Sequence, residues 1–207
     1  MKNRSPSVER ICAAAVSHFA EYGYDASSLN EIAARVGIRK ASLYAHFASK
    51  DALFMEVFSE AREQESAFVQ ASFAAEGVTS VPGEHYCKMV AARYKDSAHL
   101  RFLLRTAYLP PASLRGAITS GYEEHVQALR DLFCIGLASG RTLNGADIRV
   151  FGDAYLGIVD SLHVELVYSN EAAFERRRIA LWRILADSIG QASLALQSKE
   201  ADHSSAP

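Results

Sequence analysis

The chain has 207 residues, of which 49% are hydrophobic and 22% are charged. This composition supports a buried core and excludes a wholly disordered chain, and the length suits one large domain or two small ones. A formal net charge of −2 excludes a protein that coats nucleic acid indiscriminately, but leaves room for a local basic surface. No signal peptide is visible and no apolar run reaches the roughly 20 residues that span a bilayer, so we expect a cytoplasmic protein without a membrane partner.

Helical spacing of apolar residues predicts four helices in the first third of the chain. Pro6 stands at the first position of the first helix, which we expect to end at Gly23. Ser28 and Glu31 form a capping box that starts a second helix. Gly37 closes this helix and precedes a third of under three turns, and the fourth continues past residue 62.

The remaining chain also predicts helices only, and it shows no strand-like alternation, repeat or heptad run. A glycine- and proline-containing loop near residues 77–83 separates it from the fourth helix. The fold class is therefore all-α. The predicted helices in this part cover about residues 85–95, 97–108, 114–139, 147–168 and 171–196, and a polar, frayed tail follows.

Basic and hydroxyl side chains crowd the start of the third helix. Between Arg35 and Lys50 there are four lysines or arginines and no acidic residue. A DNA-recognition helix needs a small-residue turn, a buried face and a polar outer face; Gly37 supplies the turn, and Leu43 with Phe47 the buried face. We predict contacts to base edges or phosphate from Arg39, Lys40 and Ser42, to a thymine methyl from Ala41, and to phosphate from Ser28, Tyr44, His46 and Lys50.

These residues resemble the TetR family of transcriptional regulators. The family pattern is matched by Ser28, Ile32-Ala33, Gly37-Ile38, Ala41, Leu43-Tyr44, His46-Phe47 and Ser49-Lys50-Asp51. Ala41 stands where the family often has Gly, and Ser42 where it often has Thr. The match covers about the first 60 residues.

The resemblance implies a helix-turn-helix domain followed by a larger helical domain that binds a small molecule and dimerises through its last two helices. We accordingly predict a DNA-binding domain at 1–50, a connecting helix at 51–76, a ligand-binding and dimerisation domain at 77–197 and a flexible tail at 198–207. The partners expected are double-stranded operator DNA, a second copy of the chain and a small-molecule effector, with no cofactor.

The last two predicted helices have apolar faces broader than a single core stripe requires, which is typical of helices buried on two sides. Homodimerisation through a four-helix contact explains this breadth and pairs two DNA half-sites. The predicted interface residues are Phe151, Ile158, Leu162, Leu181, Ile184, Leu185 and Ile189.

Aromatic and polar residues in apolar surroundings are the candidates for an effector pocket, because such pockets combine apolar walls with a few polar groups. An ordinary position at the edge of the core is the alternative for each of them. The candidate ligand-binding residues are Met89, Phe102, Tyr108, Tyr122, His125, Tyr155 and His163.

Cysteine and histidine spacing indicates neither a disulfide framework nor a metal site. The three cysteines are scattered, and we expect reduced core residues; Cys87, between His85 and Lys88, is the only weak sign of a reactive thiol. His85 and Cys87 are two positions apart and do not share a helix face.

Three classes of function follow from these patterns. The leading hypothesis is a DNA-binding repressor released from its operator by a small molecule. A DNA-binding dimer that needs no ligand is the alternative. A helical-bundle enzyme is disfavoured because the sequence contains no nucleophile elbow, phosphate loop, zinc-binding HExxH or di-iron motif.

Overall fold

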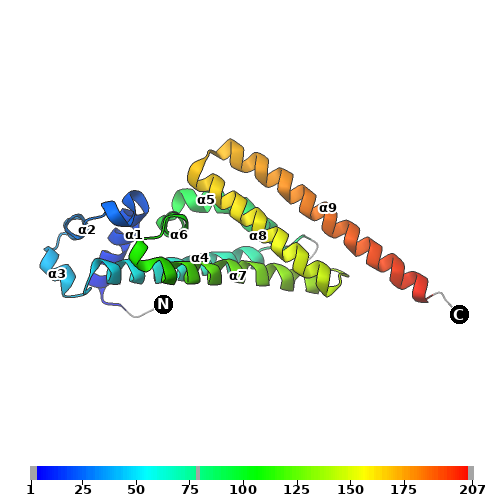
Figure 1. Cartoon of the computed structure of the whole chain (residues 1–207), viewed down its shortest axis with the longest axis horizontal. Helices are drawn as coiled ribbons and strands as arrows, with labels where there is room; N and C mark the ends of the chain where they lie inside the picture. The colour runs from blue at the N-terminus through cyan, green and yellow to red at the C-terminus, as the bar shows by residue number, and fades with distance from the viewer. Residues whose placement is uncertain (1–3, 78–79, 205–207) are drawn as a thin grey trace. The chain divides into compact units, whose positions relative to one another are not determined.

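The computed structural model describes residues 4–77 and 80–204, with the backbone alone for the last five of these. Within these ranges the chain is helical throughout, without strands, and the all-α prediction is confirmed (Figure 1). The elements are α1 (Pro6–Ala26), α2 (Leu29–Arg35), α3 (Lys40–Tyr44), α4 (Lys50–Ala74), α5 (Glu84–Asp96), α6 (Ala98–Tyr108), the 3-10 turn η1 (Ala112–Leu114), α7 (Arg115–Gly140), α8 (Gly145–Tyr168) and α9 (Glu171–Ser204).

Two helices run farther than the sequence predicted. Gly23 does not end α1; it interrupts it at φ 77° and ψ −177°, and the helix resumes to Ala26. Helix α9 continues through the predicted frayed tail to Ser204. Its added residues, from Gln197 onward, include good helix formers and no glycine or proline, so nothing local stops the helix.

The chain packs as two compact units. Unit 1 consists of the residues up to Ala67 together with Arg93–Glu124, and unit 2 consists of Phe68–Ala92 and the residues from His125 onward. Packing thus groups α6 with the N-terminal helices. The domain limits predicted at 50, 76 and 197 divide the chain by role, and that division stays a prediction.

Unit 1 is built around an aromatic core. Phe19 of α1, Phe54 of α4 and Phe102 of α6 are fully buried, and the ring centroid of Phe54 lies 4.8 Å from that of Phe19 and 5.0 Å from that of Phe102. The core continues to Leu43 of α3. Because α3 has only five residues, it depends on this packing for its position.

Unit 2 has a core with tyrosine and histidine rings. Tyr86 of α5 and Tyr155 of α8 are buried together with His125 and His163, and the Tyr155 ring stacks on Phe133 with centroids 4.4 Å apart. Helices α8 and α9 lie side by side and antiparallel (Figure 1). Buried Tyr and His require hydrogen bonds, so this core specifies its geometry more narrowly than a purely apolar one.

Candidate nucleic-acid interface

The turn between α2 and α3 is a glycine-dependent helix end. The Gly37 N–H donates to the Ala34 carbonyl at 3.1 Å and the Ile38 N–H to the Ala33 carbonyl at 3.0 Å, the pattern of a Schellman motif. Gly37 has φ 72°, and a Cβ there would meet nothing within 4 Å. The predicted glycine turn is therefore present, and it directs the chain into α3.

The start of α2 differs in part from the predicted capping box. Ser28 Oγ accepts from the Asn30 N–H at 3.2 Å, so Ser28 is the N-cap. Glu31 does not complete the box, because its Oε2 lies 3.2 Å from Nε2 of the buried His18 of α1. Burial and the nearby Arg35 lower the pKa of His18, so the pair is not a strong ion pair at neutral pH.

Helix α3 separates a buried side from an exposed side. Leu43 is fully buried and Phe47 nearly so. Arg39 is the N-cap residue and lies one position before the helix. The exposed side carries six of the eight predicted DNA-binding residues, Arg39, Lys40, Ala41, Ser42, Tyr44 and His46, while Ser28 and Lys50 are half-buried.

Lys50 is held at the start of α4 by the preceding loop. Its Nζ lies 4.2 Å from the Tyr24 ring centroid and 3.5 Å from the Asp25 carbonyl oxygen. The Tyr24 hydroxyl donates to the Asp51 carboxylate, and burial together with Asp51 raises the pKa of Tyr24 to about 12. A cation fixed at a helix N-terminus is well placed for a phosphate oxygen.

The predicted effector residues are divided between the two units. Phe102, Tyr108 and Tyr122 belong to unit 1; Phe102 is part of the aromatic core, and the rings of Tyr108 and Tyr122 are 6.5 Å apart. Met89, His125, Tyr155 and His163 belong to unit 2, where Met89 is exposed and the other three are buried. The sequence gives no means of separating these sets, because the three unit 1 residues stand between Met89 and the other unit 2 residues in the chain.

A buried polar cluster does form in unit 2. The Tyr86 hydroxyl is hydrogen-bonded to His163 Nε2 at 2.9 Å, and burial together with nearby His125 lowers the pKa of His163 to about 3. Burial raises the pKa of the Tyr155 phenol well above its ordinary value. Tyr86 was not among the predicted ligand-binding residues, although it is an aromatic residue in the same apolar surroundings.

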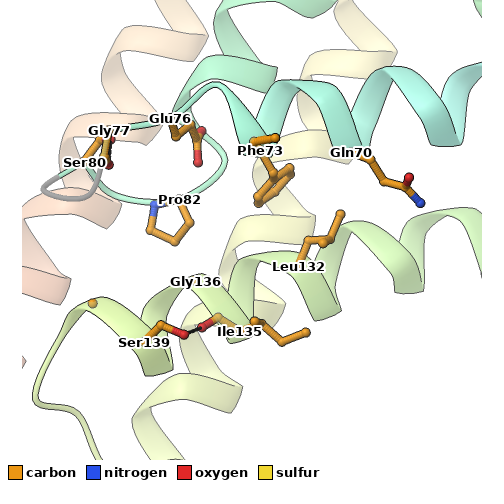
Figure 2. Close-up of a pocket in the computed structure, with 12 residues that line it drawn as sticks. Gln70, Phe73, Glu76, Gly77, Ser80, Pro82, Leu132, Ile135, Gly136 and Ser139 are labelled. Carbon is orange, nitrogen blue, oxygen red and sulfur yellow. Dashed lines mark hydrogen bonds between the residues drawn. The ribbon is translucent and has the colours of Figure 1, made fainter.

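Unit 2 also contains an open cleft with a volume of about 430 Å³ between the end of α4, the loop before α5 and α7 (Figure 2). None of the predicted effector residues lines it. Its lining is Gln70, Phe73, Ala74, Glu76, Gly77, Ser80, Pro82, Leu132, Ile135, Gly136, Ser139 and Gly140.

The predicted interface residues on α8 and α9 differ in exposure. Ile158, Leu162, Leu185 and Ile189 are buried inside the chain itself, Phe151 and Leu181 are half-buried, and Ile184 is 65% exposed. The buried four are therefore core residues of unit 2 and do not supply surface for a second copy. The exposed large apolar residues of these two helices are Val150, Val164, Tyr168, Ile179, Ile184 and Leu194.

The cysteines are free thiols in packed surroundings. Cys12 and Cys87 are buried, as predicted, and burial raises the pKa of Cys87 to about 12. The suspicion of a reactive thiol at Cys87 is therefore wrong, because a thiolate there is strongly disfavoured. In the described part of the chain no three His, Cys, Asp or Glu residues converge on a possible metal position.

None of the described helices combines the length and apolarity that crossing a bilayer requires.

The helix-turn-helix arrangement with its basic outer face is also found in known proteins. Residues 11–57, from α1 into α4, match the family model described as bacterial regulatory proteins, tetR family.

Relatives and solved structures agree with this match. The fatty acid metabolism regulator protein of Bacillus subtilis is 26% identical over 165 residues, which are 77% of this chain and 83% of that protein. The negative transcriptional regulator IcaR of a Staphylococcus aureus biofilm operon is 46% identical over 46 residues, or 22% of this chain and 25% of IcaR. The crystal structure of FadR from Bacillus subtilis in complex with stearoyl-CoA has a TM-score of 0.63 at 19% identity, covering 86% of this chain and 97% of that one.

The matched segment contains the whole α2–turn–α3 unit whose geometry is described above. Residues 11–57 thus form a helix-turn-helix segment of the tetR type, and the chain is a DNA-binding transcriptional regulator.

Proposed function

We propose that this regulator is a cytoplasmic repressor that binds operator DNA as a homodimer and is released by a small molecule bound in unit 2, and that it is not an enzyme. The observation that carries the DNA-binding part is the two-sided α3, with Leu43 in the core and a basic, hydroxyl-bearing face in solvent. Repression is favoured because the similar IcaR is named a negative regulator.

The residues of the proposed interface fall into two groups, those that read bases and those that contact phosphates. Arg39 and Lys40 reach guanine acceptors or phosphates, Ser42 hydrogen-bonds either, and the Ala41 methyl meets a thymine methyl. Tyr44 and His46 face phosphates, as do the two residues at helix starts, Ser28 and Lys50. Binding therefore combines a salt-dependent phosphate component with base readout from few side chains.

A homodimer supplies the specificity that one five-residue helix lacks, because two copies read two half-sites. We place the contact on the exposed apolar side of α8 and α9. Ile184 is the predicted interface residue with the largest exposed surface, and Val164 and Ile179 are further candidates with exposed side chains. Large apolar side chains left exposed on both helices favour an interaction surface there.

The effector part rests on the relative whose solved complex holds stearoyl-CoA and on the cleft in unit 2. A ligand shifts DNA binding only as far as it binds one state of the protein more tightly than the other. Regulation by abundance alone, without a ligand, is the alternative.

Selection of bound fragments from the source genome, followed by mobility-shift titration, tests the DNA-binding proposal. Arg39→Ala and Lys40→Ala are expected to relax preference at individual bases, whereas Tyr44→Phe weakens binding to all fragments. Unchanged base preference in both of the first two variants contradicts the proposed readout.

Sedimentation of Ile184→Glu tests the dimer. The variant is expected to be a folded monomer with reduced operator affinity, and Leu109→Glu, at an equally exposed position in unit 1, serves as the control. A dimeric Ile184→Glu protein refutes the interface. Leu185 is unsuitable for this test because it is buried inside the chain.

A further inference from the structure

The cleft of unit 2 has apolar walls from two facing helices. Phe73 projects into it from α4, and Leu132 and Ile135 from α7 (Figure 2). Ile135 is 62% exposed, although it lines the cleft. An apolar side chain left open in a concave site gains free energy when a ligand covers it, at about 25 cal/mol per Å² removed from water.

The shape of the cleft depends on Gly136. A Cβ at this position would lie 2.7 Å from Pro82 Cβ, so any larger residue would push the loop before α5 away from α7. The loop and the helix therefore approach closely at one end of the cleft. Its volume of about 430 Å³ is within the range of roughly 300–1,000 Å³ that small-molecule sites occupy.

The same end of the cleft carries a fixed negative charge. The Glu76 carboxylate accepts from the Gly83 and His85 backbone N–H groups, both at 2.9 Å, so its position is set by the start of α5. A carboxylate has about four acceptor positions, and these two bonds leave capacity for a donor in the cleft. Glu76 is half-buried, and this burial raises the pKa of its carboxyl.

No counter-charge accompanies Glu76 in the lining. Of the lining residues within the described part of the chain, Glu76 alone is ionisable, and the other polar groups are the Gln70 amide and the Ser80 and Ser139 hydroxyls. Apolar walls lead along the cleft to one carboxylate (Figure 2). A complementary ligand has an apolar body and a positively charged end.

We propose that this cleft binds a cationic amphipathic small molecule, with its apolar part between Phe73 and Ile135 and its charge beside Glu76. This rests on the proposed function, in which unit 2 holds the effector, and it names the class of that effector. An acyl-CoA, such as the one in the similar FadR complex, carries several phosphate charges that Glu76 repels. The charge that this cleft favours is thus opposite in sign to that of stearoyl-CoA.

Isothermal titration calorimetry of the full-length protein with decyltrimethylammonium, decyl sulfate and stearoyl-CoA, each below its micelle concentration, tests this assignment. We expect one decyltrimethylammonium per chain and at least tenfold weaker binding of both anions. Glu76→Gln should weaken the cation at least tenfold, whereas Glu63→Gln, at an exposed glutamate of α4 outside the cleft lining, should leave it unchanged.

Ile135→Lys provides a second test that spares the cap of α5, because the side chain is exposed. It is expected to abolish cation binding and to admit decyl sulfate. Equal binding of cation and anion by the natural protein overturns the assignment, as does cation binding that both substitutions leave unchanged.

The calorimetry needs no DNA, so its outcome is separate from that of the DNA-binding proposal. Failure to bind any genomic fragment overturns the proposed function alone. Preference for an anion in a protein that does bind operator DNA overturns the cationic class alone.

Discussion

The two units bury aromatic residues in different chemical settings. Unit 1 surrounds Phe19, Phe54 and Phe102 with apolar side chains, whereas unit 2 buries Tyr86 hydrogen-bonded to His163. An apolar core positions α3 by packing alone, and its stability is insensitive to pH through these residues. A core with hydrogen-bonded imidazole and phenol groups ties the stability of unit 2 to protonation and to the geometry of single bonds.

The largest loss of unfolding free energy is expected when a side chain of the apolar core is truncated. Phe102→Ala removes the ring that contacts Phe54, and we expect unit 1 to lose about 3–5 kcal/mol of unfolding free energy because a cavity remains. Denaturant titration followed by circular dichroism measures this loss. Leu109→Ala, at an exposed position in the same unit, should change stability by less than about 0.5 kcal/mol; similar losses in both variants would contradict the core assignment.

The next largest effect is expected from acid, which acts on unit 2 through His163 and in the same direction on unit 1 through the buried His18. His163 has a pKa of about 3 in the folded chain and about 6.5 when unfolded, so the unfolded state takes up the proton first. Stability is fully present above pH 6.5 and falls by about 1.4 kcal/mol per pH unit as the pH drops towards 3. By pH 5 the loss for unit 2 is about 2 kcal/mol.

Urea titrations at a series of pH values measure this slope, with the fluorescence of Trp182 as the probe, because this single tryptophan is buried in unit 2. His163→Gln is expected to flatten it, and His46→Gln, on the exposed face of unit 1, to leave it as it is. A slope that survives in His163→Gln would assign the acid sensitivity elsewhere.

A smaller loss of stability is expected when either of two glycines of unit 1 is replaced by alanine. Gly23 has φ 77° and ψ −177°, a region almost confined to glycine, and an added Cβ would lie 3.0 Å from Arg105 Nε. Gly23→Ala should therefore cost about 1–3 kcal/mol. Gly37→Ala has open space around it and should cost about 1–2 kcal/mol, from its left-handed backbone alone.

Thermal unfolding of the two alanine variants ranks them. An equal cost would mean that the contact with Arg105 contributes nothing beyond backbone strain. Because α6 packs against α1 in unit 1, this comparison also measures how firmly α6 holds the end of α1.

The smallest change in stability is expected at the DNA-binding face. Lys50→Ala should leave folding within about 0.5 kcal/mol and lower by about one the slope of log affinity against log salt concentration. Mobility-shift titrations over a range of salt concentrations measure the slope. Lys88→Ala, an exposed position in unit 2, is the control, and an unchanged slope in Lys50→Ala would remove this residue from the phosphate contacts.

Local signals explain why the first four helices were predicted well. Ser28 and Ser49 accept from N–H groups two and three residues ahead, and Gly37 ends α2 with hydrogen bonds made within six residues. Such bonds depend on residue types at fixed short spacing, which a sequence displays directly. The fold class and the placement of α3 follow from them.

The second half could not be predicted in the same detail because its contacts are distant in sequence. Ile184 is 65% exposed and Leu185 only 4%, yet both are branched apolar residues on one helix. Which side of α9 faces α8 is decided by packing. The cleft escaped prediction for the same reason, because Phe73, Pro82 and Ile135 are separated in the chain and ordinary in type.

The brevity of α3 constrains how this regulator changes its target sites during evolution. Arg39, Lys40 and Ser42 are exposed, so under the proposed readout substitutions at these positions are expected to change the operator preference with little loss of stability. Leu43 and Phe47 have no such freedom, since they are buried in the core of unit 1. New binding specificities therefore arise along one side of a helix whose other side stays the same.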